Sequence, residues 1–439
     1  MILFRACALV LACAACGKGK GPLPELSDSF RDNSAALPVF PGAEGFGTAT
    51  PAGRGGAVLV VNTLADDGEG SLRWALAQEG ARTIVFAVGG AIQTKRTLEI
   101  HAPFVTLAGQ TAPDPGVTVF GAGLSIQTHD VLVQHLTFRP GDAEDGPDFN
   151  DRDALQIIGR EDGSLAVFNV VIDHVSLSWS TDEVFSTWYP GVRDVTVSNS
   201  LIAEALDNSG NAKGLHSKAF LIGDHTRRLA MLRNVLAHND DRNPIFKGDT
   251  TSVVVNNFIY NPGRWPVTFF DVENAGPMLV SLQGNDFVYG PSSQDDHQTV
   301  LMSASVKTGT QFHLQDNRGW DLGSSQRSLV NFEKGNNAQL VDAAPVGFTP
   351  LTVLPVMGLE AILLRTAGSR PWMRNAEDER VVRTIVARAG RIPDNVSQVQ
   401  QPWPASTSAT LSLPAKPNAD DDGDGYTNLE EWLAELTRR

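Results

Sequence analysis

A short repeated pattern in the middle of the chain constrains its fold more than any other feature. In each copy an apolar stretch leads to a His or Asn, and a second alternating apolar stretch follows. The His or Asn positions are His135, His174, Asn199, Asn234, Asn257 and, in a weaker copy, Asn285. Successive copies lie 39, 25, 35, 23 and 28 residues apart, which indicates a unit of roughly 23 residues with loops of variable length inserted. One such unit cannot bury its own apolar face, so stacked units must supply the core.

The pattern predicts an all-β chain folded as a parallel β-helix. In this solenoid a single polypeptide winds into successive coils of short strands that stack on one another. Asn at a bend tolerates the left-handed conformation, and its amide can bond to the Asn of the next coil. We therefore interpret His135 and His174, which occupy the same position, as structural; a catalytic histidine is the less favoured alternative. Insertions collect on one side of such a stack, where a groove can form. A β-propeller is the alternative architecture, but it needs more regular blades.

The N-terminus has the features of a bacterial export signal. One basic residue and a short apolar run precede Ala14-Ala15-Cys16, which resembles a lipobox, with Cys13 as a weaker alternative start. We expect residues 1–16 to be a lipoprotein-type signal peptide lipidated at Cys16; a plain signal cleaved nearby is the alternative. All three cysteines lie in this segment, so the mature chain has no disulfide and no cysteine nucleophile.

The remaining chain divides by composition. Residues 17–37 are rich in Gly, Pro and Ser and predict a flexible tether. Residues 38–345 carry the repeat and predict the β-helix. Residues 346–417 predict a segment that wraps the solenoid and contains one amphipathic helix over Ala376–Ala389, with acids early and arginines late. Residues 418–439 predict a calcium loop followed by a helix.

The calcium loop is the most specific single motif. Oxygen ligands fall at the spacing of an EF-hand loop, with Gly425 at the sixth position where the chain turns sharply. The predicted ligands are Asp420, Asp422, Asp424, Tyr426, Asn428 and Glu431. No entering helix precedes the loop and there is one copy, so we expect a structural calcium site at the chain end. A solvated acidic tail is the alternative.

Two further clusters lie on the predicted solenoid. Asp151 and Asp153 are two residues apart and project from one face of a strand, while Asp182 and Glu183 lie about one coil further on. Stacked in this way, the acids can converge on a hard cation such as Ca²⁺. Basic residues follow at Lys218, Arg242 and Lys247, about one and two coils beyond. Ordinary surface loops and a surface salt-bridge cluster are the alternative interpretations.

An ordered set of motifs identifies the family that the chain resembles. These motifs run through Phe40-Pro-Gly-Ala-Glu44-Gly45-Phe46-Gly47, Gly70-Ser-Leu72-Arg73, Ile172-Asp173-His174 and Arg242-x-Pro244-x-x-Lys247. Over most of residues 40–290 the chain is similar to the pectate lyase superfamily, polysaccharide lyase family 1 type, as a secreted bacterial member. The resemblance implies a right-handed β-helix and calcium-assisted β-elimination on pectate or polygalacturonate, giving 4,5-unsaturated oligouronides.

The resemblance also implies roles for single residues. The family's acidic calcium pair falls on Asp151 and Asp153, and its next ligand motif, D-G-x-x-D, begins at Asp182. The catalytic arginine falls on Arg242, and the substrate-binding basic residues fall on Lys218 and Lys247. Three positions depart from the family pattern: Glu183 replaces a Gly, Ser186 replaces the second acid of that motif, and Lys247 replaces an Arg. We therefore expect weaker calcium binding, with Glu183 supplying the missing oxygen or with the substrate bridging the ion.

Charge fits the predicted cofactor and partner. The net charge of −15 argues against nucleic acid, and it repels an acidic polysaccharide unless a divalent cation lies between them. We expect a monomer that is secreted or lipid-anchored at the bacterial outer membrane or cell surface. Two alternatives stay open: a β-helix glycoside hydrolase acting on pectin, and a surface protein that binds polyuronate without cutting it. Aromatic residues near the clusters either stack on sugar rings or belong to the core: Trp179, Trp188, Tyr189 and Trp265.

Overall fold

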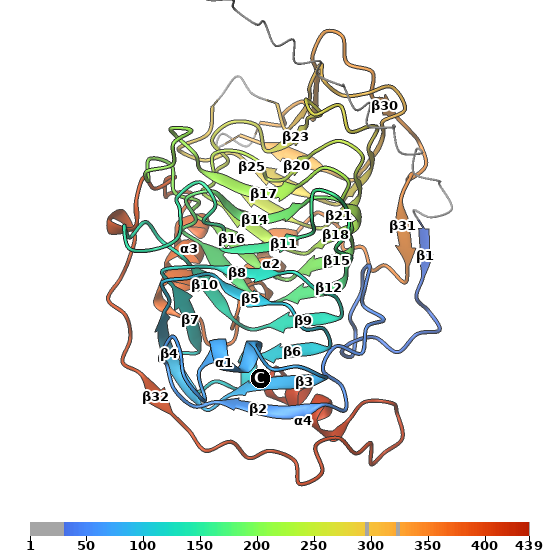
Figure 1. Cartoon of the computed structure of the whole chain (residues 1–439). Coiled ribbons are helices and arrows are strands. Elements are labelled where there is room, and N and C mark those ends of the chain that lie inside the picture. Colours follow the sequence, from blue (N-terminus) through green and yellow to red (C-terminus); the bar gives the residue numbers. More distant parts are fainter. Residues whose placement is uncertain (1–29, 295–297, 322–324, 439) are drawn as a thin grey trace, which may run out of the picture.

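The chain winds into a right-handed parallel β-helix whose coils stack from residue 57 to residue 340 (Figure 1). The computed structural model describes residues 30–438 except 295–297 and 322–324. The predicted signal peptide, Cys16 and the first part of the predicted tether lie outside these residues. Each coil contributes one strand to each of three parallel sheets, so the fold class agrees with the prediction and the β-propeller alternative is wrong.

Sheet 1 has 11 strands in the described residues, and it is the longest of the three. The inward side chains of its strands are mostly apolar and form continuous columns along the core. Several outward side chains are apolar as well and are buried beneath other segments of the chain, among them Ala230, Leu232, Val253 and Val255. The strands are β2 Ala57–Val61, β3 Arg82–Phe86, β6 Val105–Ala108, β9 Val131–Gln134, β12 Val167–Asp173, β15 Val192–Ser198, β18 Arg227–Leu232, β21 Thr251–Val255, β24 Leu279–Gln283, β27 Gln311–Gln315 and β30 Gln339–Leu340.

Sheets 2 and 3 close the coil. Sheet 2 contains β4 Val88–Gln93, β7 Val117–Phe120, β10 Thr137–Arg139, β13 Ser176–Ser178, β16 Leu201–Ala203, β19 Val235–Ala237, β22 Phe258–Tyr260, β25 Asp286–Val288 and β28 Arg318–Trp320, with β32 Thr407–Ser408 added antiparallel to β4. Sheet 3 contains β5 Leu98–Ile100, β8 Leu124–Ile126, β11 Leu155–Ile158, β14 Glu183–Trp188, β17 Lys218–Ile222, β20 Ile245–Phe246, β23 Val267–Phe269, β26 Val300–Met302 and β29 Val330–Phe332.

The corner between sheets 1 and 2 holds an asparagine ladder. The side-chain oxygen of Asn257 accepts hydrogen bonds from the backbone and side chain of Asn234, and Asn285 does the same for Asn257. Each bond joins one coil to the next, because the amide sits on the stacking axis of the corner. The oxygen of Asn234 in turn accepts from the backbone of Ser200.

The predicted alignment of the ladder is wrong by one residue in the first three copies. His135, His174 and Asn199 have positive φ angles of 58°, 49° and 50°, and they are equivalent to Arg233, the residue before Asn234. The left-handed turn and the ladder bond therefore fall on successive residues, whereas the sequence interpretation assigned both to one. Because the two histidines occupy the turn position, the ladder does not use their side chains.

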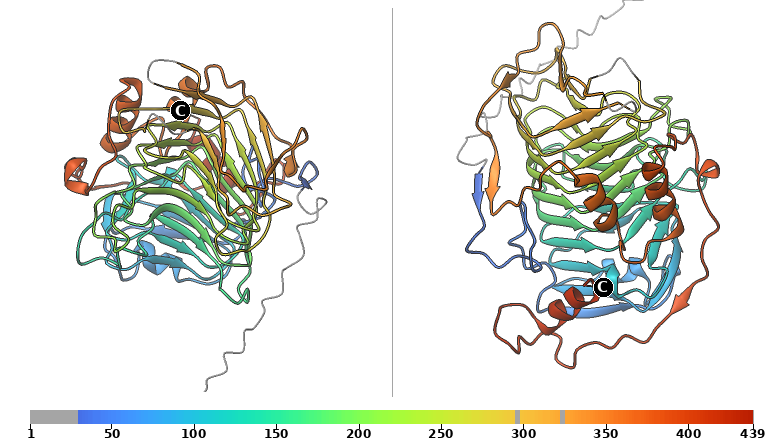
Figure 2. Two further views of the ribbon diagram at one scale, coloured as in Figure 1. Left: turned by 90° about the horizontal axis from the view of Figure 1, so that it is seen from above. Right: turned by 180° about the vertical axis from the view of Figure 1, so that it is seen from behind.

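The described segments before β2 and after β30 lie over the outside of the stack (Figure 2). Helices α2 (Leu359–Thr366) and α3 (Ala376–Val386) cover the outer face of sheet 2, where Leu363 and Ile385 are buried. The residue pattern over Ala376–Ala389 predicts α3, whereas no pattern predicts α2. Helix α4 (Asn428–Leu436) packs against the first coils of sheet 1, α1 (Leu72–Leu76) covers the start of the core, and β1 (Phe30–Asp32) pairs with β31 (Gly347–Thr349).

Candidate active site

A cleft of about 360 Å³ opens on the outer face of sheet 3. In the register of β11, β14, β17 and β20, Gln156 pairs with Ser186, Ser186 with Leu221 and Leu221 with Ile245, and all four side chains line the cleft. The alternate residues point inward, where Phe185 and Phe220 stack with ring centroids 4.3 Å apart. Because successive side chains of a strand point to opposite faces, the same strands that form the floor of the cleft are anchored in the core by their inward side chains.

Acidic side chains from successive coils meet at one end of this cleft. Asp153 precedes β11, while Asp182 and Glu183 stand at the start of β14. The Glu183 backbone N–H donates to Asp153 at 3.1 Å, and the Ser186 hydroxyl donates to the other oxygen of Asp153. Asp151 also lines the cleft and is exposed. The position where the family has a second acid therefore carries a hydroxyl that bonds directly to the acidic pair.

The crowded acids change the protonation of Asp153. Desolvation in the cleft, together with the negative charge of Asp182, raises the pKa of Asp153 to about 8, from an ordinary value of 3.8. A carboxyl group with a raised pKa ionises more readily when a cation binds beside it, because the cation stabilises the carboxylate. Its neighbours offer oxygen ligands, which are the donors that Ca²⁺ prefers. The residues present therefore fit a calcium ion.

Basic side chains occupy the other side of the cleft. Arg242 forms an ion pair with Glu183, and burial lowers the pKa of Arg242 although Asp182 and Asp153 oppose that shift. The Lys247 ammonium lies 5.4 Å from the ring centroid of Phe270 and 3.3 Å from Glu273. Acids and cations thus face one another in one cleft, which is the arrangement needed to hold a substrate carboxylate between a metal ion and protein cations.

The structure brings six predicted site residues into this cleft and leaves one beside it. The six that line it are Asp151, Asp153, Asp182, Glu183, Arg242 and Lys247. Lys218 pairs in register with Glu183 on the neighbouring strand but does not line the cleft. Its ammonium lies 3.2 Å from Asp241 and 3.9 Å from Asp240, so substrate would have to compete with these two carboxylates.

Several residues in or beside the cleft were not singled out from the sequence. His216 Nε2 lies 2.7 Å from Asp182, and Lys213 Nζ lies 3.3 Å from the same carboxylate. Both come from the loop before β17, whose path over the acidic end no local spacing indicates. Gln156 and Phe270 also line the cleft. Of these residues, only Gln156 could have been found from the sequence, because it is a polar residue between apolar neighbours in β11 and therefore points outward.

The four aromatic residues named from the sequence differ in where they lie. Trp188 and Tyr189 line the cleft, where their rings are available to a sugar. Trp179 is buried, and its indole N–H donates to Glu204 at 3.1 Å. Trp265 is not among the lining residues of this cleft.

The predicted C-terminal calcium loop is a separate acidic site. Oxygens of Asp420, Asp422 and Asp424 lie within 4.8 Å of one another, and all three residues are exposed. Desolvation and the negative charge of the same three aspartates raise the pKa of Glu431. Asn428 bonds to Asp421 at 3.0 Å, and the Tyr426 N–H donates to Asp424 at 2.8 Å. The oxygen-rich donor set and the following helix α4 fit a calcium ion.

Fold and cleft together define a parallel β-helix protein with an acidic groove flanked by arginine and lysine on one sheet. No protein-family profile matches the sequence. The chain is 30% identical to a probable pectate lyase C of Aspergillus fumigatus, over 95% of this chain and 98% of that protein. A match at 38% identity to a probable pectate lyase C of Aspergillus flavus spans 59% of this chain and 56% of that protein. The chain belongs to the pectate lyase family.

Solved structures agree with the fold. The major cedar pollen allergen jun a 1 matches with a TM-score of 0.55 at 20% identity, covering 74% of this chain and 92% of that one. A pectate lyase of Bacillus sp. N165, solved with trigalacturonate, matches with a TM-score of 0.51 at 13% identity, covering 74% and 98%.

Proposed function

We propose that the cleft on sheet 3 cleaves pectate by calcium-assisted β-elimination and releases 4,5-unsaturated oligouronides. The chain is a polysaccharide lyase by its family. One observation supports the assignment of the reaction to this cleft. Asp153, Asp182 and Arg242 come from three different coils, and all three line the cleft. That convergence is also what argues against a chance cluster of surface charges.

Elimination begins with removal of the proton α to a uronate carboxylate, which builds negative charge on that carboxylate. Calcium, when bound among the acids, would supply Lewis-acid charge and orient the substrate carboxylate. Lys247 would pair with uronate oxygens from the opposite side. Arg242 would act as the base after its ion pair with Glu183 opens, because that pair stabilises the protonated guanidinium. Water would protonate the leaving oxygen.

The test is incubation with polygalacturonate in calcium or in chelator, followed by two measurements. Ultraviolet absorbance detects the double bond of unsaturated products, and a reducing-end assay counts all cuts. We expect both signals to rise together and only with calcium. New reducing ends without absorbance would instead show a hydrolase, and binding without either signal would show a non-catalytic polyuronate binder.

We also infer that the C-terminal loop binds a structural calcium ion and that the protein is exported. The oxygen ligands of Asp420, Asp422 and Asp424 support the first inference. Export rests on the N-terminal sequence, with Cys16 as the lipidated residue. Among the described residues, no helix has the length and apolarity needed to cross a bilayer. Labelling with radioactive palmitate in a bacterial host tests the anchor: Cys16→Ser should remove the label, and a label that persists would exclude Cys16.

A further inference from the structure

A second pocket, of about 410 Å³, lies on the outer face of sheet 1. Its floor includes Gln110 and Gln134, and its walls come from both ends of the chain. Phe40 contributes from the N-terminal segment, while Trp372 and Leu433 contribute from the C-terminal segments that fold back over the stack. The pocket thus exists only because the two ends of the chain cover this sheet. The lyase chemistry proposed for sheet 3 does not use it.

One buried imidazole faces this pocket with a free lone pair. His135 is 3% exposed, and its Nδ1–H donates to the backbone carbonyl of Ser369 at 2.8 Å. A carbonyl only accepts, so this bond fixes the proton on Nδ1 and leaves the lone pair on Nε2. In the part of the chain that the structure describes, Nε2 has no hydrogen-bond partner, although His135 lines the pocket.

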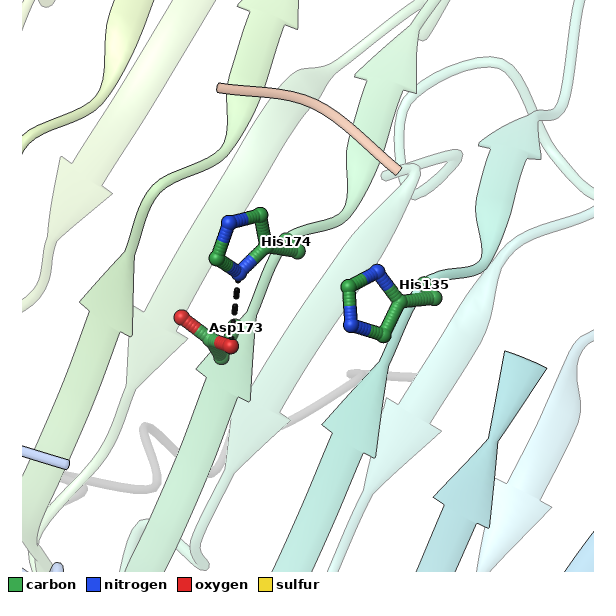
Figure 3. Close-up of side chains that lie close together, drawn as sticks. All are labelled: His135, Asp173 and His174. Carbon is green, nitrogen blue, oxygen red and sulfur yellow. Dashed lines mark hydrogen bonds and ion pairs between the residues drawn. The ribbon is translucent and has the colours of Figure 1, made fainter. Parts of the chain in front are cut away.

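Asp173 and His174 stand beside that nitrogen (Figure 3). His174 Nδ1 lies 2.8 Å from Asp173, and one ring nitrogen of each histidine lies within 4.8 Å of the other and of an Asp173 oxygen. The carboxylate is held by neighbours on the two adjacent coils: Gln134 donates to it at 3.0 Å, and Ser198 and Asn199 each donate at 2.8 Å. Fixed outer partners of this kind orient the ligands of metal sites.

The fold does not require imidazoles at these two positions. Both histidines have the left-handed backbone of the corner, and Asn199 fulfils the same turn in the next coil. Gln110 gives a second indication of a ligand: it is 7% exposed, lines the pocket, and its side-chain oxygen has no partner in the described residues.

We propose that His135, Asp173 and His174 bind one divalent transition-metal ion of the zinc or copper type. Two imidazoles and one carboxylate suit these ions, whereas Ca²⁺ prefers oxygen ligands. Ligand atoms about 2.0–2.1 Å from a tetrahedral zinc ion lie roughly 3.3 Å apart. The 2.8 Å between His174 Nδ1 and Asp173 is somewhat shorter than this separation, and the His135 ring stacks on the His174 ring with the planes 27° apart. Metal binding therefore requires the carboxylate contact to lengthen and the His135 ring to turn toward the ion. The ion replaces the His174–Asp173 hydrogen bond as the link between ring and carboxylate.

The test is calorimetric titration with Zn²⁺ of the whole chain, with its three cysteines alkylated and with excess Ca²⁺ present to occupy the oxygen sites. His135→Asn and His174→Asn keep a residue suited to the left-handed turn. His225→Asn is the matched control, because His225 also has a positive φ of 69° and pairs with Asp249 at 2.8 Å, outside the pocket.

We expect one Zn²⁺ site in the wild type and in the control, weakened roughly tenfold or more in either test variant. Electron paramagnetic resonance of bound Cu²⁺ should show coupling to two imidazole nitrogens in the wild type and to fewer in each test variant. Melting temperature and pectate cleavage, measured on the same variants, check that they fold. Absence of a Zn²⁺ site, or equal binding by folded His135→Asn and His174→Asn, would overturn the proposal whether or not the protein cleaves pectate.

Discussion

The two predicted calcium sites are built in opposite ways. The C-terminal loop takes all its ligands from residues 420–431, so the turn at Gly425 alone brings the oxygens together. The cleft takes Asp153, Asp182 and Arg242 from different coils, and the register of sheet 3 brings them together. A loop site can therefore form wherever its segment goes, while the cleft exists only when the solenoid is stacked.

The surroundings of the acids differ as well. The loop aspartates are exposed to water, which screens their mutual repulsion. In the cleft, desolvation raises the pKa of Asp153 to about 8, and the cations of Arg242, Lys213 and Lys247 lie around the acids. Catalysis requires such a desolvated, charge-balanced space, whereas structural binding does not. This difference supports the proposal that the chemistry takes place in the cleft and that the loop stabilises the fold.

Replacing Arg242 should give the largest effect. Arg242→Ala removes the proposed base, and we expect turnover to fall roughly 10²–10⁴-fold while pectate binding changes little. Initial rates from ultraviolet absorbance and a pull-down on insoluble pectate measure the two quantities. Arg193→Ala on sheet 1 is the control, since Arg193 is also paired with a carboxylate, that of Asp194, but lies outside the cleft. Turnover preserved in Arg242→Ala would remove this residue from the mechanism.

Deleting residues 418–439 should lower the stability of the fold without changing the catalytic activity. The deletion exposes the surface beneath Leu429 and Leu433, which are 3% and 6% exposed, and burying each such side chain contributes about 1.5–3 kcal/mol. We expect the free energy of unfolding to fall by about 3 kcal/mol or more. Denaturant titration measures this, and activity per folded molecule should stay unchanged. Activity lost from a folded deletion variant would mean that the C-terminal loop takes part in the reaction.

The smallest effect concerns Asp153 and pH. Because the pKa of Asp153 is raised to about 8 from 3.8, the folded state without a cation binds more protons than the unfolded state between these values. Stability in chelator should therefore fall as pH rises from about 4 to 8, and Asp153→Asn should reduce this loss. We expect the variant to melt on the order of 2 °C above the wild type at pH 8 in chelator, with the difference shrinking toward pH 4. Identical melting curves at both pH values would contradict the raised pKa.

The sequence predicted the stacked architecture because each coil carries its own apolar strands and corner residue. It misplaced the ladder position of the first three copies, because the left-handed turn and the amide bond fall on neighbouring residues such as Arg233 and Asn234. In the same way, spacing brought Asp153 and Asp182 together correctly. The contact of His216 with Asp182 and the pairing of Lys218 with Asp241 depend on paths of inserted loops, which no local pattern encodes.

The most direct test of this division of roles is a calcium titration of pectate cleavage in three proteins: the wild type, Asp182→Ala and Asp422→Ala. We expect Asp182→Ala to raise the half-saturating calcium concentration roughly tenfold or more, because it removes an oxygen ligand and its charge. Asp422→Ala should leave that concentration unchanged and should lower only the melting temperature in calcium. A shifted titration for Asp422→Ala, or an unshifted one for Asp182→Ala, would contradict the assignment of catalysis to the cleft.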